Sequence, residues 1–283
     1  MQPERCIAGI LPGRPEPSDW SSFVTWAAGE GWRVPTRELA LYRLELAESA
    51  FVLRGGEGQP LGFVTVCRHQ RSAWIGNLIV DPAQRGAGYG RRLFKHAVST
   101  MSGIGVANLW LTASADGRPI YESYGFRETE RVERWVWRCS GVVHEKIDHH
   151  DRNDLYQLAR ADAAAWGDCR VGMLTLLARG GRIVSSGSTV ALLQPGTDVH
   201  ILGPWLSADL CPRANRQILA GAMEGFAGLG EMVVDVIGSS PVRKLLSAAG
   251  FQQMGETVLM TRGEGGKVRF GEIVALASLG SMG

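Results

Sequence analysis

The chain has 283 residues, of which 45% are hydrophobic and 20% charged, with a formal net charge of +2 at pH 7. These values are typical of a globular protein with one large domain or two ordinary ones. No run of Lys or Arg stands out, so charge gives no support for a nucleic-acid or membrane-surface partner. No segment resembles a signal peptide or a membrane span, and we expect a cytoplasmic protein.

In chain order, the first half is predicted to form two helices, two strands, a glycine-rich loop, a helix, a strand, a helix and a strand. The helices are expected over residues 17–28, 36–46, 91–100 and 119–124, and the strands over residues 61–66, 73–80, 107–112 and 126–138. Apolar residues recur at helical spacing in the helices, and the strands are rich in β-branched and aromatic residues. This order predicts an α/β fold with a central mixed β-sheet flanked by helices.

The second half repeats this order at an offset of 125 residues, the distance from Gly125-Phe126 to Gly250-Phe251. The same offset places the helix of residues 91–98 on residues 216–223, and the strand of residues 109–111 on residues 234–236. Three elements at one offset favour an internal duplication over coincidence between two ordinary α/β stretches. We therefore predict two tandem domains, residues 1–139 and 142–263. A tail of residues 264–283 packs as an extra strand or covers a neighbouring surface.

The five cysteines are odd in number, scattered, and never form a CxxC pair. A disulfide framework or a structural zinc site is therefore not expected. Beyond the predicted boundary, His149 and His150 stand between Asp148 and Asp151, a group that offers metal-ligating side chains. We interpret it as a solvated turn in which Asp151 caps the next helix, and we expect no metal site.

The segment with the clearest chemical meaning runs from Asn77 to Arg92, where a buried strand ends and a helix begins. Gly86, Gly88 and Gly90 allow successive backbone N–H groups to converge and a ligand to approach the main chain closely. The partial positive charge of the helix N-terminus adds to this, so the loop suits a pyrophosphate. Its spacing matches neither the Gly-x-Gly-x-x-Gly dinucleotide fingerprint nor the Walker loop.

The Arg-x-x-Gly-x-Gly pattern at Arg85, Gly88 and Gly90 resembles the acetyl-CoA loop of the GCN5-related N-acetyltransferase (GNAT) superfamily. The preceding strand, residues 77–82, is similar to the strand before that loop. Residues 117–126 look like the later helix and strand, in which a Tyr, here Tyr121, stands four residues before a Gly. The resemblance covers roughly residues 50–138 with both motifs in order.

This resemblance implies that acetyl-CoA is the co-substrate. The backbone at Ile79 and Val80 would pair with the pantetheine amides like an added strand. Tyr121 would protonate the leaving thiolate as a general acid. The family often has Asn at the place of Ser114, and the shorter Ser puts that contact in question. The implied cofactor-binding residues are Leu78, Ile79, Val80, Arg85, Gly86, Ala87, Gly88, Tyr89, Gly90, Arg91, Ser114 and Tyr121.

The sequence does not identify the general base. Residues 73–80 carry no acidic side chain, Asp81 is expected to cap the turn at Pro82, and His69 is an ambiguous candidate. For the acceptor, the resemblance points to the segment between the first two helices. Trp32 and Arg33, with Asn77, are the predicted substrate-binding residues. They suit a substrate with an apolar and an anionic part, or else Trp32 is a packed aromatic residue and Arg33 a surface charge.

The second half lacks the features of this site. At the offset of 125, Gly88 corresponds to Arg213 and Tyr121 to Leu246. Side chains stand where a pyrophosphate needs bare backbone, and Leu246 has no proton to donate. We expect a degenerate domain that completes the fold, forms a wall of the acceptor pocket or binds another ligand.

Together these observations predict transfer of an acetyl group from acetyl-CoA to a primary amine, expected to be that of a small molecule. The amine attacks the thioester directly. Two alternatives stay open: a non-catalytic sensor that binds an acyl-CoA, and an acetyltransferase acting on protein lysines or N-termini. A homodimer is a further possibility, since nine Trp residues leave room for an apolar interface.

Overall fold

The computed structural model describes residues 11–139, 152–226, 230–264 and 267–283. The first half contains nine regular elements in the predicted order, apart from one additional strand, β1. They are α1 (Asp19–Gly29), α2 (Thr36–Arg43), β1 (Ala50–Arg54), β2 (Pro60–Arg68), β3 (Ser72–Val80), α3 (Tyr89–Gly103), β4 (Asn108–Ala113), α4 (Arg118–Glu122) and β5 (Arg127–Cys139).

The second half repeats the same order of nine elements, in agreement with the predicted duplication. They are α5 (Arg152–Trp166), α6 (Val171–Ala178), β6 (Arg182–Ser186), β7 (Thr189–Gln194), β8 (Val199–Ser207), α7 (Pro212–Glu224), β9 (Gly230–Ile237), α8 (Arg243–Ala248) and β10 (Gln252–Arg262). A 3-10 turn and a short strand, β11 (Ile273–Ala275), follow in the tail.

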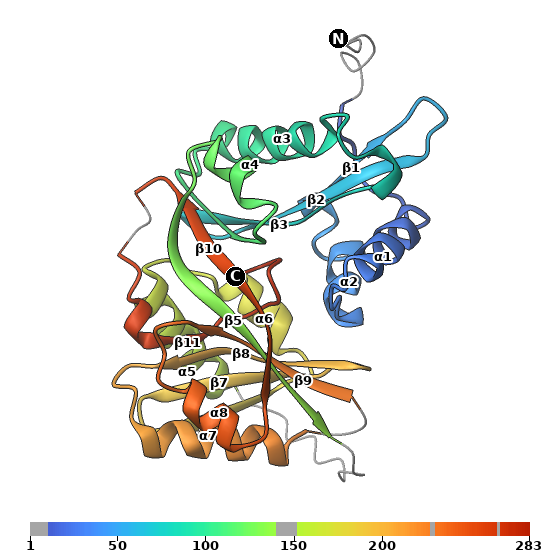
Figure 1. The fold of residues 1–283 in the computed structure, drawn as a ribbon. Coiled ribbons are helices and arrows are strands. Elements are labelled where there is room, and N and C mark those ends of the chain that lie inside the picture. Colours follow the sequence, from blue (N-terminus) through green and yellow to red (C-terminus); the bar gives the residue numbers. More distant parts are fainter. Residues whose placement is uncertain (1–10, 140–151, 227–229, 265–266) are drawn as a thin grey trace.

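The two halves share one sheet of 11 strands in the order β1-β2-β3-β4-β10-β5-β9-β11-β8-β7-β6. Each half therefore gives its last strand to the other. Strand β10 pairs with β4, as Val258 with Ala113, and β5 pairs with β9, as Val136 with Val233. Figure 1 shows these two long strands running between the halves. The predicted boundary near residue 140 is thus a division of the sequence, and the sheet continues across both halves.

Strands β3 and β4 separate partway along their length. They pair in parallel only through residues 72–74 and 108–110, although β3 continues to Val80 and β4 to Ala113. Just beyond this pairing, the register between β2 and β3 shifts, and Asn77 adopts a left-handed φ of 51°. A bulge of this kind bends a strand and interrupts its ladder. The backbone of residues 77–80 is consequently not paired with β4.

The second half has the same opening, but its own chain fills it. Strands β8 and β9 pair in parallel through residues 199–201 and 231–233, and β11 then lies between them. Ala275 pairs with Trp205 of β8 and with Val236 of β9. The tail thus packs as an extra strand, one of the two predicted arrangements.

Three apolar clusters hold the helices on the sheet. Helix α3 packs on the first half through Leu93, Phe94 and Ala97, and α7 packs on the second half. The third cluster spans both halves and joins α1, α2, α5 and α6 to the sheet; in it, the Trp166 ring meets the Trp110 ring at a centroid distance of 5.6 Å. Among the described residues, no helix combines the length and apolar character needed to cross a membrane.

Candidate functional site

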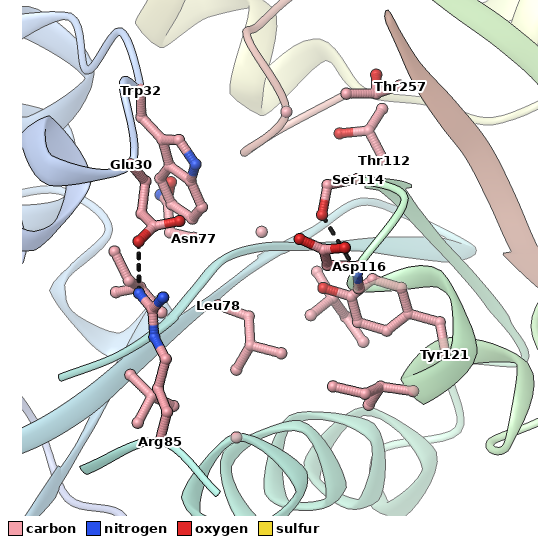
Figure 2. Close-up of a pocket in the computed structure, with 18 of the residues that line it drawn as sticks. Glu30, Trp32, Asn77, Leu78, Arg85, Thr112, Ser114, Asp116, Tyr121 and Thr257 are labelled. Carbon is pink, nitrogen blue, oxygen red and sulfur yellow. Dashed lines mark hydrogen bonds and ion pairs between the residues drawn. The ribbon is translucent and has the colours of Figure 1, made fainter. Parts of the chain in front are cut away.

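A cavity of about 810 Å³ opens where β3 and β4 separate. Its walls come from the glycine-rich loop, the start of α3, the α1–α2 connection, the β4–α4 loop, strands β5 and β10, and the tail. Figure 2 shows Trp32 and Asn77 on one side of this cavity, and Ser114, Asp116 and Tyr121 on the other.

The glycine-rich loop presents bare backbone to the cavity. Gly86 and Gly88 both have φ of 84°, a left-handed conformation that favours glycine, and a Cβ at either would meet open space. Within the described residues, the N–H groups of residues 86–91 donate no hydrogen bond, whereas the N–H of Arg92 already bonds to the Gly88 carbonyl. A row of free N–H groups at a helix N-terminus is an anion site, and it fits a pyrophosphate.

The structure brings the predicted cofactor-binding residues together around this cavity, with the exception of Ala87, which does not line it. Arg85 stands at the rim, where its Nη2 contacts Glu30 Oε1 at 2.6 Å. Ser114 Oγ accepts a hydrogen bond of 3.2 Å from the Gly117 N–H, so this hydroxyl holds the start of α4. Both polar contacts are visible in Figure 2.

Tyr121 reaches the cavity from α4 and is partly buried. Its ring packs against Phe94 at a centroid distance of 4.9 Å. Burial raises the pKa of the Tyr121 hydroxyl to about 12. The hydroxyl therefore stays protonated at neutral pH, as a general acid requires.

The predicted substrate-binding residues Trp32, Arg33 and Asn77 also line the cavity. Trp32 remains 39% exposed, and its ring faces the cavity in Figure 2. Arg33 is not free for an anionic substrate, because its Nε donates to Glu231 Oε2 at 2.6 Å. The interpretation of Arg33 as the partner of an anion therefore loses its support.

Several lining residues were not singled out from the sequence, notably Glu38 on α2, Arg134 on β5, Thr257 on β10, and Leu279 and Gly280 in the tail. A signal for Glu38 was present: it shares the helical spacing of the buried residues Leu41 and Tyr42, so it had to face inward. The others reach the cavity through the strand exchange and the tail, which no local sequence pattern predicts.

The two base candidates weighed from the sequence do not line the cavity. His69 is buried, and desolvation lowers its pKa to about 3. Asp81 Oδ1 accepts a hydrogen bond of 3.0 Å from the Ala83 N–H, which is the predicted turn cap.

In the second half, side chains fill the region that corresponds to the loop. Asn215 is buried, and its Nδ2 donates to Ser207 Oγ at 3.1 Å and to the Cys211 carbonyl at 3.0 Å. Leu246 is buried in the core. With β11 between β8 and β9, the described residues of this half leave no opening between these strands like that between β3 and β4.

The histidine pair at residues 149 and 150 lies outside the described residues. Within the described part of the chain, no group of three or more His, Cys, Asp or Glu side chains is placed to hold a metal ion.

Comparison with known families identifies the part of the chain that carries this site. Residues 47–128 match the model of the acetyltransferase (GNAT) domain. The match covers the separated strands, the glycine-rich loop and Tyr121. Residues 47–128 therefore resemble a GNAT acetyltransferase domain.

Similar proteins extend the likeness beyond this GNAT domain. Holothin acyltransferase from Pseudoalteromonas sp. (strain SANK 73390) is 24% identical over 92% of this chain and 90% of its own length. A Pyrococcus horikoshii protein assigned as an acetyltransferase superposes with a TM-score of 0.77 at 19% identity, over 100% of this chain and 99% of that one. A tandem GNAT protein from the clavulanic acid biosynthesis pathway superposes with a TM-score of 0.60 at 14% identity, over 90% of this chain and 98% of that one. The fold is therefore that of GNAT proteins, some of them tandem.

Proposed function

We propose that this protein transfers an acetyl group from acetyl-CoA to a primary amine of a small molecule, by direct attack of the amine on the thioester. The observation that carries the proposal is the geometry of one cavity. It joins an anion site of free N–H groups, an unpaired strand edge and a protonated tyrosine.

Each part has a role in this reaction. The N–H groups of residues 86–91 bind the pyrophosphate, and the free edge of residues 78–80 pairs with the pantetheine amides. The co-substrate supplies an activated acyl group. Tyr121 donates its proton to the sulfur as the carbon–sulfur bond breaks, so that CoA leaves as the neutral thiol.

The holothin acyltransferase similarity supports acyl transfer to a small molecule, because it covers 92% of this chain and therefore both halves. The acetyl group, the amine acceptor, the cytoplasmic location and a homodimer remain predictions.

Calorimetric titration with acetyl-CoA tests the co-substrate. We expect one site per chain, since β11 occupies the corresponding opening in the second half. Gly90→Leu should abolish binding without unfolding the protein. Gly90 lines the cavity with an ordinary backbone conformation, and a Cβ there meets only Val80, at 3.5 Å.

Arg213→Gly is the matched control, because Arg213 is exposed in the first turn of α7, the counterpart of α3. It should bind acetyl-CoA like the wild type. Two sites per chain would contradict the expectation that the second half does not bind acetyl-CoA, and no binding would refute the proposed co-substrate. Thiol release on adding amines then measures transfer. Binding without transfer to any amine would favour the sensor.

A further inference from the structure

A buried carboxylate lies in the wall of the cavity, away from the glycine-rich loop. Glu38 is 7% exposed, and within the described residues its Oε2 has no hydrogen-bond partner. The cavity has two other acidic residues in its wall, Glu30 and Asp116, and both are exposed. Among the described lining residues, Glu38 is thus the carboxylate that is buried with an oxygen, Oε2, left without a hydrogen-bond partner.

Its charged neighbours do not neutralise Glu38. The positive charge of Arg134 acts on Glu38, but its Nε and Nη2 donate to the Asp235 carboxylate at 2.7 and 2.6 Å, and Nη2 also donates to the Leu279 carbonyl. Burial raises the pKa of Glu38 to about 7; Ser281 and Arg134 oppose the rise, and Asp235 adds to it. The polar and titratable groups that interact electrostatically with Glu38 are Arg134, Asp235, Ser281, Tyr42 and Cys67.

The cations of the cavity indicate which acceptors fit. Among the described residues in its wall, Arg33 pairs with Glu231, Arg85 with Glu30 and Arg134 with Asp235. The remaining cation, Arg91, lies in the first turn of α3, among the N–H groups proposed to bind the pyrophosphate. Away from the glycine-rich loop, the described cavity wall therefore offers no unpaired cation to an anionic group of the acceptor. It offers instead the apolar surfaces of Trp32, Val34 and Leu279.

We propose that Glu38 is the catalytic base, and that the acceptor is a small primary amine with an apolar body and no anionic group. The inference rests on the proposed function and names the acceptor side of the same cavity. The amine nitrogen forms a bond to the acyl carbon and the carbon–sulfur bond breaks. Glu38 takes a proton from the nitrogen, and Tyr121 gives a proton to the sulfur. Solvent then returns both residues to their starting states.

Two amines that differ by one carboxylate test the acceptor class. Phenethylamine has an aromatic body and no anion, and phenylalanine adds a carboxylate to the same skeleton. With acetyl-CoA as donor, we expect kcat/KM for thiol release to be at least about tenfold higher for phenethylamine, because the carboxylate would lose its water without gaining a cation. Equal rates, a preference for phenylalanine, or no transfer to phenethylamine would overturn this class.

Glu38→Gln tests the base. Near neutral pH we expect kcat with phenethylamine to fall by about 10²–10⁴-fold, with acetyl-CoA binding unchanged. The deficit should shrink as the pH approaches the pKa of the amine, because more of the amine then arrives already deprotonated. Glu57→Gln, the same change at an exposed turn between β1 and β2, should have the wild-type profile. A Glu38→Gln protein with wild-type kcat at every pH would overturn the role of Glu38 while leaving the proposed function intact.

A binding measurement gives a readout that does not depend on transfer. Calorimetry of phenethylamine binding to the protein–CoA complex, in two buffers of different ionisation enthalpy, counts the protons released. A cation bound beside Glu38 displaces its proton, so the wild type should release about half a proton near pH 7. The Glu38→Gln variant should release none. Equal release from both proteins would place the ammonium elsewhere, and failure to bind CoA would instead refute the proposed function.

Discussion

The Arg134 guanidinium donates two hydrogen bonds to the Asp235 carboxylate, of 2.7 Å from Nε and 2.6 Å from Nη2. Arg134 lies on β5, in the first half of the sequence, and Asp235 lies opposite it on β9, in the second. This pair connects β5, the strand that the first half contributes to the second, with β9, and Arg134 also lines the cavity. One interaction therefore connects the exchanged strand with the wall of the site.

Arg134→Met should be strongly destabilising. The Asp235 side chain is 3% exposed and would lose its cation, a loss that typically costs about 3–5 kcal/mol of unfolding free energy. Arg138→Met is the control. The Arg138 side chain is 56% exposed, and its partner Glu231 would still pair with Arg33 after the substitution. This variant should lose less than about 1 kcal/mol of unfolding free energy. Urea unfolding measures both. Similar values for the two variants would show that the buried pair contributes little.

Tyr121→Phe should lower kcat by about 10²–10⁴-fold, because the leaving thiolate loses its proton donor. The Tyr121 hydroxyl makes no hydrogen bond with another described residue, so acetyl-CoA binding and stability should change little. Tyr124→Phe removes a hydroxyl one helical turn away, which bonds to the Arg91 carbonyl at 3.3 Å, and should keep kcat near the wild-type value. Steady-state thiol release compares them. A Tyr121→Phe enzyme with unchanged kcat would exclude the acid role.

Glu38 should make stability depend on pH. Its pKa is about 7 in the folded state and 4.5 in the reference state, so the folded protein binds more protons between these values. The unfolding free energy should therefore fall as the pH rises through this window, by roughly 3 kcal/mol, and level off above it. Glu38→Gln should remove this part of the slope. Unfolding curves from about pH 4 to 8 test it, and a slope unaffected by the substitution would show that Glu38 titrates normally.

Gly76→Ala should disturb the contact between β3 and the tail. A Cβ at Gly76 would lie 2.6 Å from Ser281 Cα, too close for either backbone to remain in place. We expect a loss of about 1–3 kcal/mol and weaker acceptor binding, since the adjoining residues Leu279 and Gly280 line the cavity. Gly103→Ala, at the end of α3 with nothing within 4 Å, should be neutral or slightly stabilising. Thermal unfolding measures both variants, and equal changes in their melting temperatures would contradict the close contact between Gly76 and the tail.

Local sequence patterns predict the part of this site proposed to bind the co-substrate. Local patterns predicted β3, α3 and α4, because periodicity and glycine placement depend on near neighbours. The bare loop at Gly86 and Gly88 and the position of Tyr121 follow from those elements. The same offset that revealed the repeat also showed that Arg213 and Leu246 replace the glycine and the tyrosine.

The other walls of the cavity depend on contacts between residues far apart in the chain, which local patterns do not predict. The exchange of β5 and β10 brings Arg134 to Asp235, a separation of 101 residues. The tail places Ala275 in the opening of the second half and Leu279 in the wall of the first-half cavity. What a strand gains from its neighbours depends on its tertiary context, so a local pattern does not specify which half a final strand joins. The helical spacing on α2 predicts that Glu38 faces inward, but the absence of a partner for its Oε2 among the described residues depends on the tertiary packing.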